Sequence, residues 1–225
     1  MDDYLSEQEQ WEEVKGWIRE GLPWFIGAVV VVAGAWSGWK AWQSHREGQF
    51  AAAGAQYEQL IRALDRNDEQ QATSLADQLS SDYAGYGYAD QGQLALARLQ
   101  VEHNELAPAL ERLQKVLATT KDAELRPLVR LRVARVQFQQ GQGEAALATL
   151  SAGGADLGAF APRYAELRGD VLLAKGDREG ALKAYREAQA AGQADGAAAG
   201  AATVPAAGQA SSELLALKIN DLSRP

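Results

Sequence analysis

The architecture follows from VARVQFQQGQGEAALATL (residues 133–150) and RGDVLLAKGDREGALKAY (168–185). In the first stretch, a small residue precedes Gly141 by seven positions and another follows it by five, and the second stretch repeats both offsets around Gly176. These small residues are Ala134, Ala146, Gly169 and Ala181. Two antiparallel helices that cross closely need small side chains at the crossing, and glycine supplies the left-handed conformation that ends the first helix. Each stretch therefore predicts a helix, a turn and a second helix.

Two earlier stretches carry the same pattern, LARLQVEHNELAPALERL (96–113) around Asn104 and QLIRALDRNDEQQATSLA (59–76) around Asn67. The equivalent crossing positions are Ala97 and Ala109 in the first, and Leu60 and Ala72 in the second. The four turn residues are thus spaced by 37, 37 and 35 positions. About four helix pairs with no strand pattern between them predict an all-α chain with a tetratricopeptide-like α-solenoid over residues 40–189. A generic helical bundle is the alternative.

An apolar segment precedes the repeats. Residues 21–39, GLPWFIGAVVVVAGAWSGW, contain no ionisable side chain. As a helix this segment would be about 28 Å long, close to the ~30 Å hydrocarbon core of a bilayer. It predicts a single transmembrane helix. The alternatives are a buried helix of a soluble protein and a cleaved signal peptide, but the acidic residues ahead of the segment are unlike the basic start of a signal peptide.

The predicted anchor residues lie at the ends of the apolar segment or at positions where another helix could pack against it. Trp24 lies near one end of the apolar segment, and Trp39 and Trp42 lie at the other, where indole rings favour the headgroup layer. The remaining anchor residues are Gly34, Gly38 and Lys40. The two glycines form a small-xxx-small pair that would let another helix approach, although glycine is also simply frequent in membrane helices. Basic residues are balanced on the two flanks, so charge does not fix the orientation.

Residues 1–20 form an acidic tail. It contains seven acidic residues against two basic ones, and Trp11, Val14 and Ile18 share one side of a short predicted amphipathic helix. A solvated acidic terminus and a contact surface for a basic partner are both compatible with this composition. Residues 40–66 contain no proline, so the membrane helix can continue into the first repeat.

The C-terminal part departs from the repeat pattern. Residues 190–211 are rich in Ala and Gly and predict a loose loop or a frayed helix. Residues 212–225 predict a helix that caps the last repeat, because Leu215, Ile219 and Leu222 form one apolar stripe.

Composition excludes several classes of function. The chain has no cysteine, so it has no disulfide, thiolate nucleophile or cysteine metal site. Its only histidines, His45 and His103, are far apart in sequence, and the common phosphate-loop, zinc-protease and serine-hydrolase motifs are absent. A net charge of −8 leaves no electrostatic footprint for nucleic acid. We therefore predict a non-enzymatic protein without cofactor or metal.

Stacked helix pairs favour protein binding, because they present a groove to a partner's peptide or helix. The candidates on the first helices of the pairs are Gln56, Gln93, Arg130, Arg135 and Arg168. Arg132 would join Arg130 and Arg135 in a local basic patch. Ordinary surface charge is the alternative for each of these residues.

The chain resembles the ancillary SecYEG translocon subunit family. The resemblance covers nearly the whole chain and is carried by EQEQWEEVKGWIRE (7–20), SGWKAWQSH (37–45), LRVARVQ (131–137), LRGDVLLAKGDREGA (167–181) and LKINDL (217–222). The repeat motifs are individually weak, and their order behind the tail and the anchor is more specific. The first part of the apolar segment, with its Trp24, and the Ala/Gly insert depart from the family pattern.

The resemblance implies a single-pass protein of the bacterial inner membrane, with the amino terminus in the cytoplasm and the repeats in the periplasm. It implies association with the SecYEG translocon and with a membrane-anchored parvulin-type chaperone, and help in handing over translocated client proteins. The alternative is a membrane tether in an envelope stress response, whose acidic tail sequesters a cytoplasmic response regulator.

Overall fold

The computed structural model describes the backbone of residues 7–154, 157–198 and 206–223, and the side chains of residues 24, 28–154, 157–194 and 212–223. Within these residues the chain forms nine α-helices and one short 3-10 helix, without a strand. It divides into two compact units, Met1–Ala52 and Ala53–Pro225. The all-α class that the sequence predicts is therefore confirmed for the described residues.

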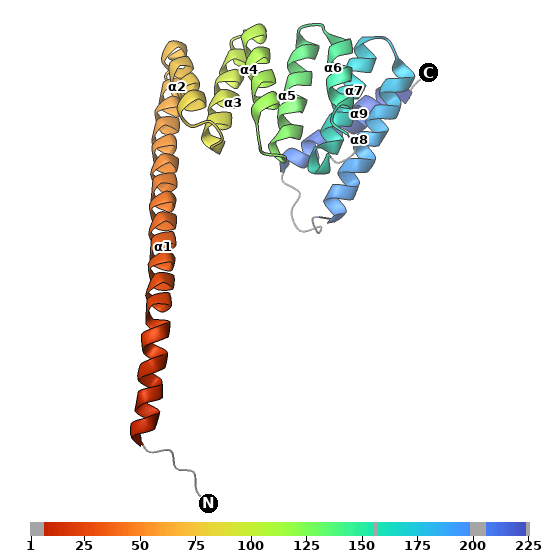
Figure 1. The fold of residues 1–225 in the computed structure, drawn as a ribbon. Coiled ribbons are helices and arrows are strands. Elements are labelled where there is room, and N and C mark those ends of the chain that lie inside the picture. The colour runs from red at the N-terminus through yellow and green to blue at the C-terminus, as the bar shows by residue number, and fades with distance from the viewer. Residues whose placement is uncertain (1–6, 155–156, 199–205, 224–225) are drawn as a thin grey trace, which may run out of the picture. The chain divides into compact units, whose positions relative to one another are not determined.

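The helices follow one another along the chain with short connections (Figure 1). They are α1 (Glu7–Asp65), α2 (Glu69–Asp82), α3 (Gly87–Glu102), α4 (Leu106–Thr119), α5 (Leu125–Gln139), α6 (Gly143–Ser151), the 3-10 helix η1 (Gly158–Phe160), α7 (Ala161–Ala174), α8 (Arg178–Ala198) and α9 (Ala206–Ser223). The first unit contains most of α1. The second contains the last turns of α1 and all later helices, and its helices from α2 to α8 stand side by side (Figure 1).

The four predicted turn residues all adopt the left-handed conformation. Their φ angles are 54° at Asn67, 62° at Asn104, 77° at Gly141 and 86° at Gly176. In each turn, the N–H of the next residue donates to the carbonyl five residues earlier, with N···O distances of 2.9, 2.7, 2.9 and 3.0 Å. This bond is characteristic of the Schellman motif, which satisfies carbonyls left free at a helix end. One local rule therefore ends the first helix of every pair, and the predicted repeat is confirmed.

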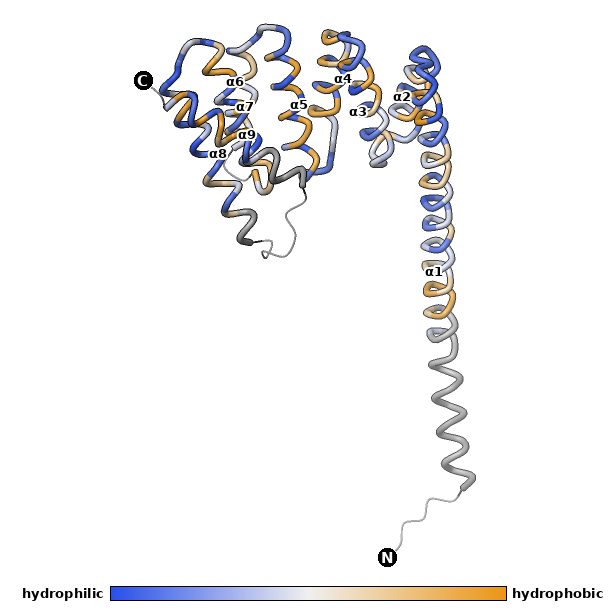
Figure 2. Tube along the Cα trace, turned by 180° about the vertical axis from the view of Figure 1, so that it is seen from behind, coloured by the Kyte–Doolittle hydropathy of each residue, from blue (hydrophilic) through white to orange (hydrophobic). Residues whose placement is uncertain are grey.

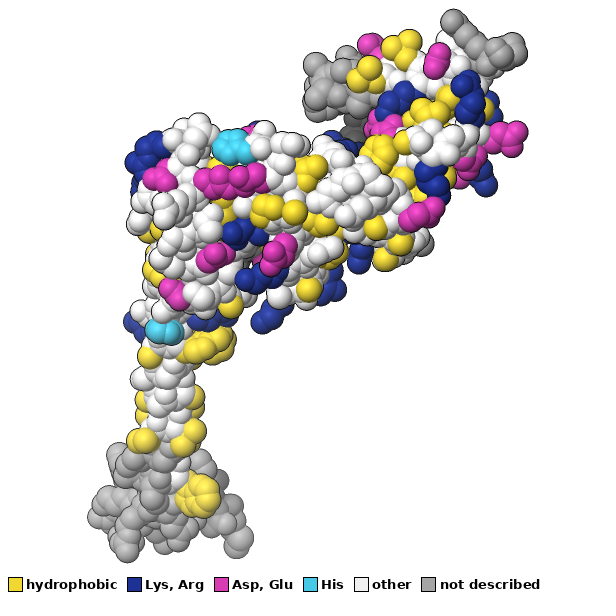
Figure 3. All heavy atoms as spheres, turned by 90° about the horizontal axis from the view of Figure 1, so that it is seen from above, with side chains coloured by type: hydrophobic (Ala, Val, Ile, Leu, Met, Phe, Trp, Pro, Cys, Tyr) yellow, Lys and Arg dark blue, Asp and Glu magenta, His cyan; other side chains and the backbone are white. Residues whose placement is uncertain are grey.

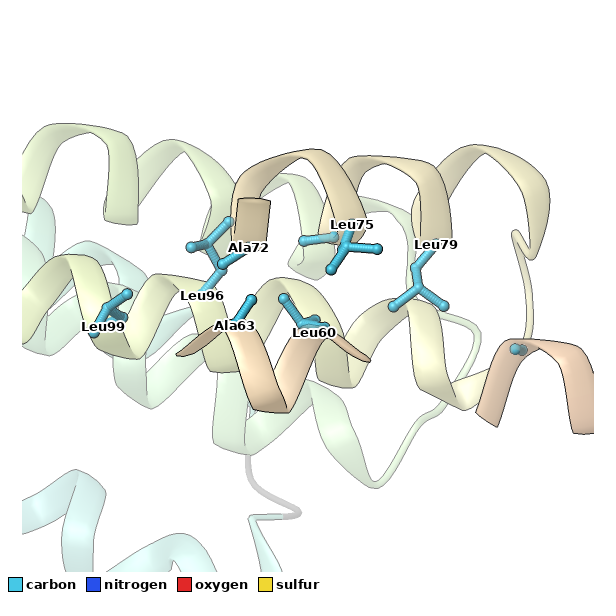
Figure 4. Close-up of a cluster of buried hydrophobic side chains, with 9 residues drawn as sticks. Leu60, Ala63, Ala72, Leu75, Leu79, Leu96 and Leu99 are labelled. Carbon is cyan, nitrogen blue, oxygen red and sulfur yellow. The ribbon is translucent and has the colours of Figure 1, made fainter. Parts of the chain in front are cut away.

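Four apolar clusters join each helix pair to the next. Their buried residues extend from Ala53 to Leu99, from Leu94 to Val136, from Leu131 to Val171 and from Ala165 to Leu215. In the first cluster, side chains of α1, α2 and α3 point toward one another (Figure 4). Each fully buried leucine or valine stabilises the folded unit by about 1.5–3 kcal/mol. Because neighbouring clusters overlap in sequence, the core runs along the stack from pair to pair.

The predicted crossing positions lie in this core. Ala97, Ala109, Ala134, Ala146 and Ala181 have at most 1% of their surface exposed. Gly169 is buried against the ring of Tyr185. The first pair has the larger Leu60 at the equivalent position, and α3 makes room for it with Gly92, where an added Cβ would lie 3.0 Å from Leu60 Cδ2.

The Ala/Gly-rich segment 190–211, predicted as a loose loop or a frayed helix, is helical at both of its edges. Helix α8 continues to Ala198, and α9 begins at Ala206, before the predicted start at 212. Alanine has the strongest helix propensity of all residues, which explains why helix persists at both edges of this segment. The predicted apolar stripe of α9 does pack on the last pair: Leu215 is buried, and Ile219 and Leu222 pack against the same cluster.

Candidate protein-binding site

The predicted anchor residues in the first unit are exposed. Trp24, Trp39 and Trp42 have exposed fractions of 84%, 63% and 51%. The rings of Trp39 and Trp42 lie 5.5 Å apart between centroids, and the Arg46 guanidinium lies 4.8 Å from the Trp42 centroid. Aromatic rings with a neighbouring cation form a belt that suits a polar–apolar boundary.

The other anchor positions lie on the same exposed helix. Lys40 is exposed, and an added Cβ at Gly34 or Gly38 would meet nothing within 4 Å. Within the described residues, no helix has an apolar stretch long enough to cross a bilayer. Several side chains of the predicted span 21–39, and the predicted amphipathic helix of the tail, lie outside the residues whose side chains are described.

Gln93 is buried, so it is not available to a partner as predicted. Its side-chain amide donates to the Ala76 carbonyl at 2.9 Å and to Ser80 Oγ at 2.9 Å, and its Oε1 accepts from Arg112 at 2.8 Å. Arg112 also pairs with Asp77 at 2.9 Å. Burial opposes ionisation of Asp77, but hydrogen bonds from Arg112 and Gln93 outweigh this and lower its pKa. The network ties α2, α3 and α4 together and has a structural role.

Three other predicted binding residues also have partners within the chain. Gln56 Nε2 donates to Gln78 Oε1 at 3.2 Å, and Arg168 forms an ion pair with Glu187 that links α7 to α8. Arg130 lies beside Tyr164, where burial raises the pKa of the phenol and the Arg130 charge opposes that rise. The charge of Arg130 thus acts on Tyr164, whereas the charge of Arg135 acts on Arg132.

Arg135 instead belongs to a group with Arg132 and Arg98, which we call the arginine cluster. Arg132 is half-buried and Arg135 is exposed, both on α5, while Arg98 is exposed on α3. Burial lowers the pKa of the Arg132 guanidinium, and repulsion from Arg98 and Arg135 lowers it further. The helices that carry these residues share one apolar cluster, which holds them side by side.

Two residues of the arginine cluster occupy the same position in their repeats as an acidic residue of the last helix pair. Arg98, Arg135 and Asp170 each stand six positions before the turn residue of their own repeat, on α3, α5 and α7. We call the face that these equivalent positions define the odd-helix face. Charged side chains of both signs are interspersed over the view of the molecule in Figure 3, so acidity is not gathered into one continuous surface there.

Helix α9 packs on the last helix pair through polar contacts as well as apolar ones. Lys218 Nζ donates to Glu166 Oε1 at 3.0 Å and to Asp170 Oδ1 at 2.8 Å, and the Tyr185 hydroxyl donates to Asp170 Oδ1 at 2.7 Å. Burial acts to lower the pKa of Lys218, but its hydrogen bonds to Asp170 and Glu166 outweigh this and raise it. Burial and the hydrogen bond to Asp170 raise the pKa of Tyr185.

Apolar contacts accompany this charge pairing. Leu215 of α9 is buried against Ala165 of α7 and Ala188 of α8, and α9 crosses the end of the array on the side that Figure 2 presents. The contact thus combines a buried leucine with one cation placed between two carboxylates.

Within the described part of the chain, no group of His, Asp or Glu side chains could hold a metal ion.

Comparison with known proteins agrees with this architecture. Residues 15–224 match the family model described as "Tetratricopeptide repeat-like domain". Proteins named "Ancillary SecYEG translocon subunit" are 32% identical in Escherichia coli, over 99% of this chain and 100% of that protein, and 32% identical in Haemophilus influenzae, over 84% and 91%. The Neisseria gonorrhoeae protein of the same name is 26% identical over 84% and 90%.

Solved structures support the fold. The crystal structure of BtubC (BKLC) from P. vanneervenii aligns with a TM-score of 0.54 and 14% identity, over 78% of this chain and 82% of that one. A crystal structure of MamA protein aligns with a TM-score of 0.51 and 14% identity, over 76% and 89%. At this level of identity the likeness concerns the arrangement of helices alone.

Proposed function

Because the chain belongs to the ancillary SecYEG translocon subunit family, we propose that it is a single-pass membrane adaptor that acts beside the Sec translocon. The observation that carries the proposal is the extent of the similarity to the Escherichia coli relative, which covers 99% of this chain and so takes in its acidic tail, its apolar segment and its repeats. Repeat architecture of this kind suits a scaffold, because stacked helix pairs form an extended binding surface.

The exposed side chains of the first unit support a membrane location. Val29, Val30, Val31 and Val32 have exposed fractions between 51% and 71%, and Trp36 is 72% exposed. A helix that exposes so many large apolar side chains needs an apolar environment. Residues 21–39 are long enough to span the ~30 Å hydrocarbon core of a bilayer. The orientation that the family resemblance implies places the amino terminus in the cytoplasm and the repeats in the periplasm.

In this arrangement the repeats bind a membrane-anchored, parvulin-type periplasmic chaperone, and the adaptor keeps that chaperone close to clients leaving the translocon. We assign this contact to the odd-helix face, where Arg98 and Arg135 are exposed. The tether alternative depends on residues 1–20, whose side chains lie outside the described part of the chain.

Site-specific photocrosslinking in intact cells tests the proposal. A photoreactive amino acid at Val30 in the first unit is expected to capture translocon subunits, and one at Arg135 in the second is expected to capture the chaperone, each identified by mass spectrometry. The matched control is Arg186, an exposed arginine on α8 away from the arginine cluster. Recovery of the full-length protein in the soluble fraction after alkaline extraction of membranes would contradict the anchored adaptor.

A deletion separates the adaptor from the tether. Removal of residues 2–18 should leave copurification of the translocon and the chaperone intact, because both contacts are assigned to parts of the chain that follow the tail. Loss of both contacts in this variant, or their retention after the repeats are replaced by an unrelated domain, would refute the adaptor.

A further inference from the structure

The side chain of Arg46 lies against an aromatic ring of the first unit. Its guanidinium is 4.8 Å from the centroid of the Trp42 ring, and that centroid is 5.5 Å from the centroid of the Trp39 ring. At about 100° per residue, Trp39, Trp42 and Arg46 lie within about 60° of one another around the axis of α1. All three side chains are exposed, so they form one surface on α1, which we call the Trp–Arg surface.

The contact with a ring distinguishes Arg46 from the other arginines of the chain. Other exposed arginines also lack an ion pair, but among the described residues Arg46 is the one arginine whose guanidinium lies over an aromatic ring. Its neighbour Glu47 accepts a hydrogen bond from Gln43 Nε2 at 3.0 Å, and no described carboxylate lies within ion-pair distance of Arg46. A ring stacked on the face of a guanidinium leaves the N–H donors in its plane available to an anion.

The position of Arg46 along α1 indicates which anion it would meet. Trp39 ends the apolar segment 21–39, and at about 1.5 Å per residue the Cα of Trp42 lies about 4.5 Å beyond it. Helical side chains lean toward the amino-terminal end of their helix, and the contact with Trp42 shows that the Arg46 guanidinium does so. In a bilayer of about 40–45 Å with a hydrocarbon core of ~30 Å, each headgroup layer is about 5–7 Å thick. A span that ends at Trp39 therefore places the guanidinium in the headgroup layer, at the level of the lipid phosphates.

We propose that the Trp–Arg surface binds the phosphate group of an anionic phospholipid at the end of the membrane helix. The proposal rests on the proposed membrane anchor and adds a specific ligand to it. The Arg46 guanidinium donates two parallel hydrogen bonds to phosphate oxygens, and the Trp42 ring holds the guanidinium in place. An anionic headgroup is preferred to a zwitterionic one, because a choline group would bring a second positive charge close to Arg46.

Native mass spectrometry of the full-length protein, released from non-ionic detergent micelles, measures the bound lipid directly. Phosphatidylglycerol is the probe, and phosphatidylcholine with the same acyl chains is the matched lipid. We expect one molecule of phosphatidylglycerol to bind in preference to phosphatidylcholine. Arg46→Gln should weaken the binding of phosphatidylglycerol about fivefold, which is the contribution typical of one basic side chain at an anionic membrane surface.

Arg62→Gln is the matched control, because Arg62 is an exposed arginine of the same helix that pairs with Glu58 at 3.7 Å. This control should bind phosphatidylglycerol as the unmodified protein does, and equal losses in the two variants would show general charge attraction and overturn the proposal. Trp42→Leu keeps an apolar side chain but removes the ring, so it should also weaken the binding of phosphatidylglycerol. Unchanged binding in that variant would mean that a lone charge suffices, and the site formed by two residues would be refuted.

Two further measurements separate the lipid site from the membrane anchor. Displacement of phosphatidylglycerol by inorganic phosphate at a similar concentration would assign the Trp–Arg surface to a free anion and overturn the lipid assignment. Arg46→Gln should stay in the membrane fraction after alkaline extraction, because the apolar segment is unchanged, and its release would assign Arg46 to insertion instead of lipid binding. Recovery of the unmodified protein in the soluble fraction would refute the anchor. Equal binding of the two lipids by an unmodified protein that stays in the membrane fraction would refute the lipid site alone.

Discussion

Replacement of Gly169 by alanine tests how tightly α7 and α8 cross. A Cβ added to Gly169 would lie 2.5 Å from Cε1 and 2.6 Å from Cδ1 of Tyr185. Ordinary contacts between such atoms are about 3.5–4.0 Å, so the ring or the helix must move by about 1 Å. The ring has little freedom, because Tyr185 is fully buried and its hydroxyl donates to Asp170.

Two opposing effects set the magnitude. Alanine is favoured over glycine within a helix by up to about 1 kcal/mol, whereas overpacking of a well-packed core costs about 1–3 kcal/mol. The expected net loss in the free energy of unfolding is therefore about 1–2 kcal/mol, which corresponds to a midpoint lower by about 2–8 °C for a domain of this size. Circular dichroism of the full-length protein during heating measures this shift.

Gly192→Ala is the matched control, because Gly192 lies in α8 and the nearest atoms to an added Cβ are 4.0 Å away. That variant should be as stable as the unmodified protein or more so. Adding Tyr185→Leu to Gly169→Ala should cost less than the sum of the single effects, since the smaller side chain vacates the clash. If Gly169→Ala raised the melting midpoint as Gly192→Ala does, the tight crossing would be refuted.

Other substitutions probe the remaining features. Gln93→Leu removes one of the two acceptors of the partly buried Arg112 guanidinium and should lower the free energy of unfolding in urea by about 1–3 kcal/mol. A loss below about 0.5 kcal/mol would contradict the structural role of the network. Gly141→Ala, at a φ of 77°, should cost about 1–2 kcal/mol, and an unchanged stability would mean that the turn relaxes. The pKa of Lys218 is higher in the folded protein than in the unfolded chain, so the charged lysine stabilises the fold at pH values below its ordinary pKa of about 10.4. This stabilisation is lost as the pH rises through the pKa of Lys218 in the folded protein. The melting midpoint of the unmodified protein should therefore fall more steeply above about pH 10.4 than that of Lys218→Met; parallel curves would count against the ion pairs.

The local rules of the repeats could be predicted from sequence. Asn67, Asn104, Gly141 and Gly176 were identifiable because only a few residue types tolerate the left-handed conformation. The crossing positions followed from their fixed offsets to these turns. The stripe of α9 followed from its helical period.

The composition of the candidate site was harder to predict, because sequence spacing does not tell which side of a helix faces solvent. At about 100° per residue, Arg130 and Arg132 point about 160° apart, whereas Arg132 and Arg135 are only about 60° apart. Spacing alone thus separates Arg130 from the other two, and this arithmetic could have corrected the predicted patch. The contribution of Arg98 required the pairing of α3 with α5, and the burial of Gln93 required its three partners on neighbouring helices.

The overlapping apolar clusters have a consequence for how the protein acquires its structure. Every cluster draws its residues from a short window of sequence, so no helix pair must wait for a distant part of the chain before it can close. Low contact order of this kind favours rapid folding. A polypeptide delivered from its amino-terminal end can consolidate one pair after another, and the growing edge stays apolar until α9 arrives to cover it.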